Sequence, residues 1–140
     1  MPIVNKLNIN FCHHSLQKNK SMTTQQIANR LVELCREGEF EKAQKELFSE
    51  DAISIEPEAS AGFEKETKGL NAILEKGHLW SQMVEETHGG SVSEPLIAGN
   101  AFAVDLVMDI TMKGKGRSKM TELCVYQVKD GKIASEQFFM

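Results

Sequence analysis

The chain has 140 residues, of which 41% are hydrophobic and 26% charged, values typical of one globular domain with a substantial core. The formal net charge of −4, without a basic stripe interleaved with aromatic residues, argues against nucleic acid as a partner, because phosphate binding needs a clustered basic surface. No apolar run approaches the roughly 20 residues that cross a bilayer, so we expect no membrane association.

The three cysteines, Cys12, Cys35 and Cys124, are an odd number and lack the CxxC or CxxH spacing of a zinc site. This pattern favours a reducing compartment, hence a cytoplasmic protein, and predicts no metal site. Cys35 falls on the apolar stripe of a predicted helix. We therefore interpret it as a core residue and not as a nucleophile.

Residues 1–21 lack periodicity and contain no apolar segment of the roughly 7–15 residues found in a signal peptide. We interpret them as a disordered N-terminal extension, followed by one domain over residues 22–140. Met22 is a candidate start, because a helix cap follows it directly. The pair His13-His14 suggests a metal site, but no third ligand is near, and a polar tail is the simpler interpretation.

Two helices are predicted at the start of the domain. Residues 23–26 (TTQQ) match a capping box, so a helix should run to about Glu37 and end at Gly38. Its buried face is marked by residues at 3–4 spacing, namely Ile27, Leu31, Leu34 and Cys35. A shorter helix over residues 40–48 should bury Phe40, Ala43 and Leu47.

The middle of the chain predicts a short strand, a loop and a third helix. The strand covers residues 51–56 and ends at Pro57, and residues 58–68 are polar and loop-like. The helix covers residues 69–86, with His78 at the boundary of its buried face. That face comprises Leu70, Ile73, Gly77, Trp80 and Val84.

The last third of the chain predicts a sheet. Residues 101–112 alternate apolar and polar, residues 118–129 form the next strand, and Asp130-Gly131 predicts a hairpin turn into residues 132–139. Upstream, residues 91–97 are a further candidate in which Pro95 favours an edge or a bulge. We therefore expect a four-stranded antiparallel meander, with one more strand earlier in the chain.

This order of elements resembles the nuclear transport factor 2-like superfamily, in particular its SnoaL-like branch, over about residues 23–140. The segments that carry the resemblance are Phe48-Ser49-Glu50-Asp51-Ala52, Glu56-Pro57, Gly69-Leu70-Asn71-Ala72-Ile73, Asp130-Gly131-Lys132-Ile133 and Phe138-Phe139. The resemblance implies an α+β fold, a cone-shaped α+β barrel in which a curved, antiparallel-rich sheet wraps three N-terminal helices and leaves an apolar pocket. It also implies a homodimer through the outer face of the sheet. Because this superfamily includes isomerases, cyclases, dehydratases and non-catalytic domains, it fixes the fold better than the function.

In the ketosteroid isomerases of the superfamily, an acidic residue before a proline at the end of the first strand is the general base, and Glu56 occupies the matching place. The tyrosine and protonated aspartate of their oxyanion hole fall on Leu31 and Cys124. Leucine cannot donate a hydrogen bond and a thiol donates weakly, so steroid isomerisation is not expected. The acidic and basic set of the epoxide hydrolases is not evident either.

The same register predicts which strand residues point into the pocket. If Cys124 does, then Met120, Glu122 and Tyr126 on the same strand do so as well. On the last strand the inward set is then Ala134, Glu136, Phe138 and Met140. The preceding strand then directs Val104, Leu106, Met108 and Ile110 inward and Asp105 and Asp109 outward. Glu56, Glu122 and Glu136 become candidate catalytic carboxylates, with at least one pKa raised by burial and mutual repulsion. Candidate ligand contacts are Tyr126, Trp80, Cys124, Met108 and Phe138.

Structural roles for these residues remain open. Glu122 and Glu136 would then satisfy backbone groups or pair with Lys or Arg, and Tyr126 and Trp80 would be core aromatics.

For function, we consider an enzyme that shifts a proton beside the carbonyl of a small apolar or amphipathic compound without a cofactor. The alternatives are a non-catalytic binder, for which an acidic pocket favours a cation, and a protein-interaction domain.

Overall fold

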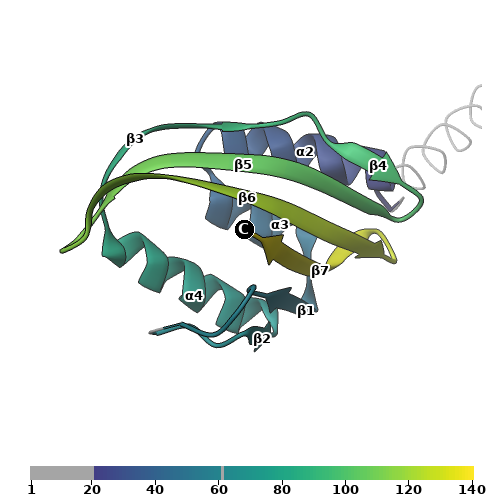
Figure 1. Ribbon diagram of the computed structural model, residues 1–140. Helices are drawn as coiled ribbons and strands as arrows, with labels where there is room; N and C mark the ends of the chain where they lie inside the picture. The colour runs from purple at the N-terminus through teal and green to yellow at the C-terminus, as the bar shows by residue number, and fades with distance from the viewer. Residues whose placement is uncertain (1–20, 61) are drawn as a thin grey trace, which may run out of the picture.

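The structure is a computed structural model, and it describes residues 21–60 and 62–140. The predicted disorder of the N-terminal extension and the interpretation of His13-His14 concern residues that lie outside this part of the chain, apart from Ser21. The expected α+β fold, with a curved and mainly antiparallel sheet around three helices, is confirmed. Its described part consists of three helices and a seven-stranded curved, open sheet (Figure 1).

The first helix, α2 (Thr24–Arg36), begins at the predicted capping box. The Thr23 hydroxyl accepts from the Gln26 N–H at 3.2 Å, and the Gln26 side chain accepts from the Thr23 N–H at 2.9 Å. Gly38, with φ +76°, follows the helix end in a conformation that glycine adopts without strain. On its apolar stripe, Ile27, Leu31 and Leu34 are buried, as the 3–4 spacing predicts, and Cys35 is partly buried.

The second helix, α3 (Phe40–Leu47), buries Ala43 and Leu47 as expected, but the expected burial of Phe40 is wrong. Phe40 is 43% exposed, because it is the first residue of α3 and lies at the rim of a cavity. The third helix, α4 (Leu70–Met83), ends earlier than the predicted 86. Only Ile73 on its apolar face is fully buried, since that face borders the same cavity.

The strands are β1 (Phe48–Ile55), β2 (Glu66–Lys68), β3 (Val84–Val92), β4 (Leu96–Ala98), β5 (Ala101–Met112), β6 (Gly116–Lys129) and β7 (Lys132–Phe139). They form one sheet in the order β2-β1-β7-β6-β5-β3, with β4 also paired to β5. The pairing of β1 with β7 is parallel, and the other pairings are antiparallel. The predicted four-stranded antiparallel meander is present as β4, β5, β6 and β7, although its first strand, β4, has only three residues.

Three details of the predicted strands are corrected. The strand expected over 91–97 is two strands, since β3 already starts at Val84 and Pro95 lies in the link before β4. The expected loop over 58–68 contains β2, which pairs with β1. A bulge in the β6–β7 pairing places Ile133, and not Ala134, in the core.

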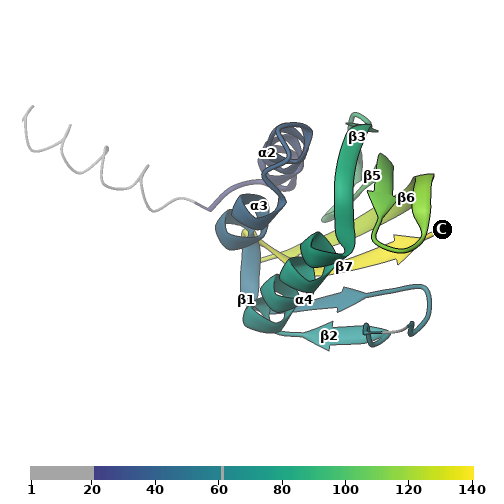
Figure 2. The same cartoon turned by 90° about the vertical axis from the view of Figure 1, so that its left-hand side faces the viewer.

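The core lies between the helices and the concave face of the sheet, which curves around α4 (Figure 2). Phe102 and Tyr126 stack with ring centroids 4.8 Å apart, and Phe48 meets Tyr126 edge-on at 6.5 Å. All three rings belong to the buried core. In the described part of the chain, no helix has the length and apolar character needed to cross a membrane.

Candidate functional site

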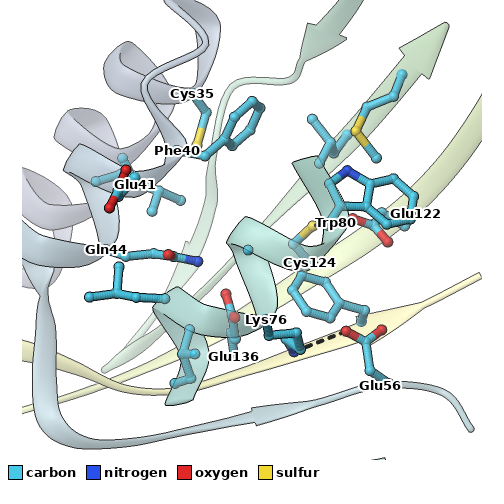
Figure 3. Close-up of a pocket in the computed structure, with 18 of the residues that line it drawn as sticks. Cys35, Phe40, Glu41, Gln44, Glu56, Lys76, Trp80, Glu122, Cys124 and Glu136 are labelled. Carbon is cyan, nitrogen blue, oxygen red and sulfur yellow. Dashed lines mark hydrogen bonds and ion pairs between the residues drawn. The ribbon is translucent and has the colours of Figure 1, made fainter. Parts of the chain in front are cut away.

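A cavity of about 400 Å³ opens between α4 and the concave face of β5, β6 and β7. Its size lies in the range of small-molecule sites. The structure brings together at this cavity all eight residues singled out from the sequence, namely Glu56, Glu122, Glu136, Tyr126, Trp80, Cys124, Met108 and Phe138. Figure 3 shows how the labelled members of this set face the same space.

The inward register explains why the strand residues meet. Cys124 on β6 is paired with Val104 on β5 and Phe138 on β7, and Tyr126 is paired with Glu136. Side chains at spacing two on these strands therefore share the concave face. Asp105 and Asp109 belong to the opposite face, where Arg117 donates two hydrogen bonds to Asp109, each at 3.0 Å.

Glu136 is the most deeply buried of the three carboxyls, at 4% exposure. It accepts a hydrogen bond of 2.8 Å from the Ser54 hydroxyl. Burial raises the pKa of Glu136 to about 7, with smaller contributions from the charges of Glu56 and Glu122; the Ser54 hydrogen bond and the charge of Lys76 oppose the rise. Its carboxyl can thus hold or release a proton near neutral pH.

Glu122 lies on β6 near the apolar wall that includes Trp80 (Figure 3). Burial, and next the charge of Glu56, raise the pKa of Glu122 to about 6. The Cys124 thiol donates to Glu122 Oε1 at 3.9 Å, and this contact and the charge of Lys76 lower the pKa in part. The cavity therefore holds two carboxyls whose pKa values are raised to different extents.

Glu56 has a specific partner that the sequence reasoning missed. Lys76 Nζ donates to Glu56 Oε1 at 3.0 Å and to the Ser54 hydroxyl at 2.6 Å (Figure 3, dashed line for the ion pair). The Lys76 side chain is 14% exposed and its Nζ lies 5.6 Å from the ring centroid of Phe138. The position of Lys76, three residues after Ile73 and four before Trp80, is the signal that places it on the inward face of α4.

The two cysteines that line the cavity are poorly ionised thiols. Burial, followed by the charge of Glu136, raises the pKa of Cys35 to about 12. Burial likewise raises the pKa of Cys124 well above its ordinary value, with added effects from Glu122 and Glu136. Both are therefore weak nucleophiles, in line with the interpretation of Cys35 as a core residue.

Two further polar side chains line the cavity, His78 at its edge and Tyr126 in its interior. His78 Nε2 lies 3.0 Å from Glu41 Oε1 and links α4 to α3 at the cavity edge. Burial raises the pKa of Tyr126 well above its ordinary value, so its hydroxyl stays protonated and is a neutral donor. Among the described residues, no three His, Cys, Asp or Glu side chains are placed to hold a metal ion.

The chain has a cone-like α+β fold whose sheet covers an acidic cavity, and comparison with known families identifies the branch to which it belongs. The family model described as "SnoaL-like domain" matches residues 22–140. The chain belongs to this family. A search of curated proteins gave no significant match.

Three solved structures illustrate the relationship. A Mesorhizobium loti protein, provisionally described as a SnoaL-like polyketide cyclase [carbohydrate phosphatase], is 35% identical, with a TM-score of 0.78, covering 85% of this chain and 100% of that one. A Streptomyces antibioticus protein, IdmH, provisionally described as a polyketide cyclase, is 19% identical, with a TM-score of 0.64 over 84% and 91% of the two chains. A Catenulispora acidiphila protein with a ketosteroid isomerase-like fold, in complex with trimethylamine, is 15% identical, with a TM-score of 0.63 over 81% and 84%. The last two show likeness of fold alone.

Proposed function

We propose that this protein catalyses cofactor-independent proton transfer on a small, largely apolar carbonyl compound, as in isomerisation, cyclisation or dehydration. The observation that carries the proposal is the pair Glu122 and Glu136 in one cavity, with pKa values raised to about 6 and about 7. A base and an acid near neutral pH are what proton transfer beside a carbonyl requires. The description of the M. loti relative as a polyketide cyclase supports the same reaction class.

In this proposal one carboxyl is the general base and the other is the general acid. Glu122, which is mostly ionised at neutral pH, takes the proton from the carbon beside the carbonyl. Glu136, which is still partly protonated there, returns a proton at the new position. This division differs from the role that the resemblance implies for Glu56, because the Glu56 carboxylate is held by Lys76 at 3.0 Å.

The ligand contacts proposed from the sequence fit an apolar or amphipathic compound. Trp80, Met108 and Phe138 offer apolar and aromatic surface along the cavity, and Tyr126 and Cys124 lie on its β6 wall. Trp80 and the exposed Phe40 add apolar surface beside the polar pair His78 and Glu41, so the apolar part of a substrate larger than the cavity can pack there.

The test follows deuterium uptake in D2O beside the carbonyl of cyclohexanone and of 2-tetralone, by ¹H NMR. We expect uptake above background with the wild type and its loss, by at least tenfold, in Glu122→Gln and Glu136→Gln. Glu85→Gln, an exposed glutamate on β3, is the matched control and should exchange like the wild type. If the double variant Glu122→Gln/Glu136→Gln exchanges either ketone as fast as the wild type, the proposal fails.

A second candidate is a non-catalytic binder of a small cation, because the described residues that line the cavity include four glutamates, Glu41, Glu56, Glu122 and Glu136, and one lysine. Titration with tetramethylammonium separates the two. Tight binding of this cation together with no exchange of either ketone would favour the binder.

We also propose that the protein forms a homodimer through the outer face of the sheet. Leu123 and Phe139 are paired on that face and are 45% and 47% exposed. Apolar side chains gathered on an exposed sheet face are typical of an interface. Sedimentation of the wild type and of Leu123→Lys tests this, with a dimer expected for the first and a monomer for the second.

A further inference from the structure

Lys76 is the one lysine or arginine among the described residues that line the cavity. Its side chain leaves the middle of α4 and is 14% exposed. Placing an ammonium in a largely apolar space costs free energy unless partners compensate for the lost water. The Lys76 ammonium is therefore only partly solvated by water, and it can interact strongly with a ligand bound in the cavity.

The Lys76 ammonium has one more N–H group than it has acceptors among the described residues. An ammonium carries three N–H groups. In the described part of the chain, its acceptors are Ser54 Oγ at 2.6 Å and Glu56 Oε1 at 3.0 Å. The third N–H is available to a ligand that enters beside Phe138, over whose ring the ammonium lies.

The proposed reaction needs such a donor. Removing a proton beside a carbonyl places negative charge on the carbonyl oxygen, and fixed donors aimed at that oxygen lower the barrier. The two positions that hold these donors in related isomerases are Leu31, which cannot donate, and Cys124, whose thiol is directed to Glu122. Tyr126 on β6 remains a neutral donor, whereas Lys76 brings a positively charged donor to the cavity from α4.

We propose that Lys76 donates a hydrogen bond to the carbonyl oxygen of the substrate and stabilises the negative charge that develops on it. This inference rests on the proposed proton-transfer function. Ser54 and Glu56 are then positioning residues, which hold the ammonium in place from β1 and from the residue that follows it. The acidic residue before Pro57 thus acts through Lys76.

The charges around Lys76 also narrow the substrate class. Glu56, Glu122 and Glu136 line the same cavity, so a substrate that is already an anion meets repulsion. A neutral, enolisable ketone does not, and it acquires charge only at the oxygen that Lys76 contacts. The site therefore selects a neutral ketone or β-dicarbonyl compound over a carboxylate.

The test uses 4-nitrophenol, whose phenolate oxygen resembles that of an enolate and whose ionised form has its own absorption band. The ionisation of the bound phenol is measured by absorbance against pH in the wild type, Lys76→Met, Lys76→Arg and Lys129→Met. We expect the bound phenol to ionise at least tenfold more readily in the wild type than in Lys76→Met. Lys76→Arg should retain most of this effect, and Lys129→Met, which removes an exposed lysine at the far end of β6, should retain all of it.

Equal ionisation of the bound phenol in the wild type and Lys76→Met would overturn the role of Lys76, and so would a wild type that does not bind 4-nitrophenol. Neither result bears on the proposed proton-transfer function. That function is tested independently by deuterium uptake into the ketones with the wild type, Glu122→Gln and Glu136→Gln. Circular dichroism checks that each variant is folded. If Lys76→Met is not, Lys76→Gln, which keeps polar contacts without the charge, makes the same comparison.

Discussion

The Ser54 hydroxyl donates to Glu136 Oε1 at 2.8 Å, and the two residues are paired where β1 runs parallel to β7. The same hydroxyl accepts from Lys76 Nζ at 2.6 Å. Ser54 is 0% exposed, so these contacts replace the water that the hydroxyl has lost. One serine thus connects the buried carboxyl of β7 to the ammonium of α4.

Replacing Ser54 by alanine should raise the pKa of Glu136 further above about 7, because the serine hydrogen bond stabilises the ionised carboxylate. The loss of an acceptor for Lys76 should also lower the free energy of unfolding by about 1–3 kcal/mol. NMR titration of the Glu136 carboxyl carbon and urea unfolding measure the two effects. Ser118→Ala, at an exposed position on β6, is the control. An unchanged Glu136 titration in Ser54→Ala would contradict the assigned hydrogen bond.

Glu136 should make the protein less stable as the pH rises. Its carboxyl ionises near 4.5 in the unfolded chain and near 7 in the folded one. Between these values the folded state binds more protons, so the free energy of unfolding falls with rising pH, by roughly 3 kcal/mol in total. Glu122, with its pKa raised to about 6, acts in the same direction.

The measurement is urea unfolding at pH 5, 6, 7 and 8 for the wild type and Glu136→Gln. The wild type should lose stability between pH 5 and 7, and Glu136→Gln should show a clearly shallower decline, since glutamine does not titrate. Glu85→Gln, exposed on β3, should follow the wild type. Parallel curves for the wild type and Glu136→Gln would show that the folded-state pKa of Glu136 is not raised.

Gly90 and Gly89 offer a matched pair on β3. A Cβ added at Gly90 would lie 2.5 Å from the backbone oxygen of Val107 on β5, whereas one at Gly89 meets nothing within 4 Å. Gly90→Ala should therefore force β3 away from β5 and cost about 1–3 kcal/mol. Gly89→Ala should change stability by less than about 0.5 kcal/mol. Thermal unfolding of both variants decides this, and similar melting temperatures would refute the close approach.

Much of the fold was predictable because local patterns and tertiary contacts agree. The alternation in β5 and the Asp130-Gly131 turn each specify a strand or a hairpin without help from distant residues, and both match the structure. β3 could not be found in this way. Its sequence (VEETHGGSV) is polar, does not alternate and contains two glycines, and it is a strand because it pairs with β5.

The candidate site was predictable where it lies on strands. A register anchored at Cys124 was enough to direct Glu122 and Glu136 to the cavity. Lys76 was missed because a lysine on an amphipathic helix is ordinarily assigned to the solvent face. Its inward orientation depends on Ser54 and Glu56, two acceptors on another element, and helix periodicity alone does not show such partners.

The thiols of Cys35 and Cys124 should react slowly with iodoacetamide. The reagent attacks the thiolate, and burial raises the pKa of Cys35 to about 12 and that of Cys124 well above its ordinary value. At pH 8 we therefore expect both to be modified at least a hundredfold more slowly than in the urea-unfolded chain. Mass spectrometry of peptides measures each site in a Cys12→Ser variant, which removes the remaining thiol. Rapid modification of Cys35 in the folded protein would mean that it is a reactive group of the cavity and not a core residue.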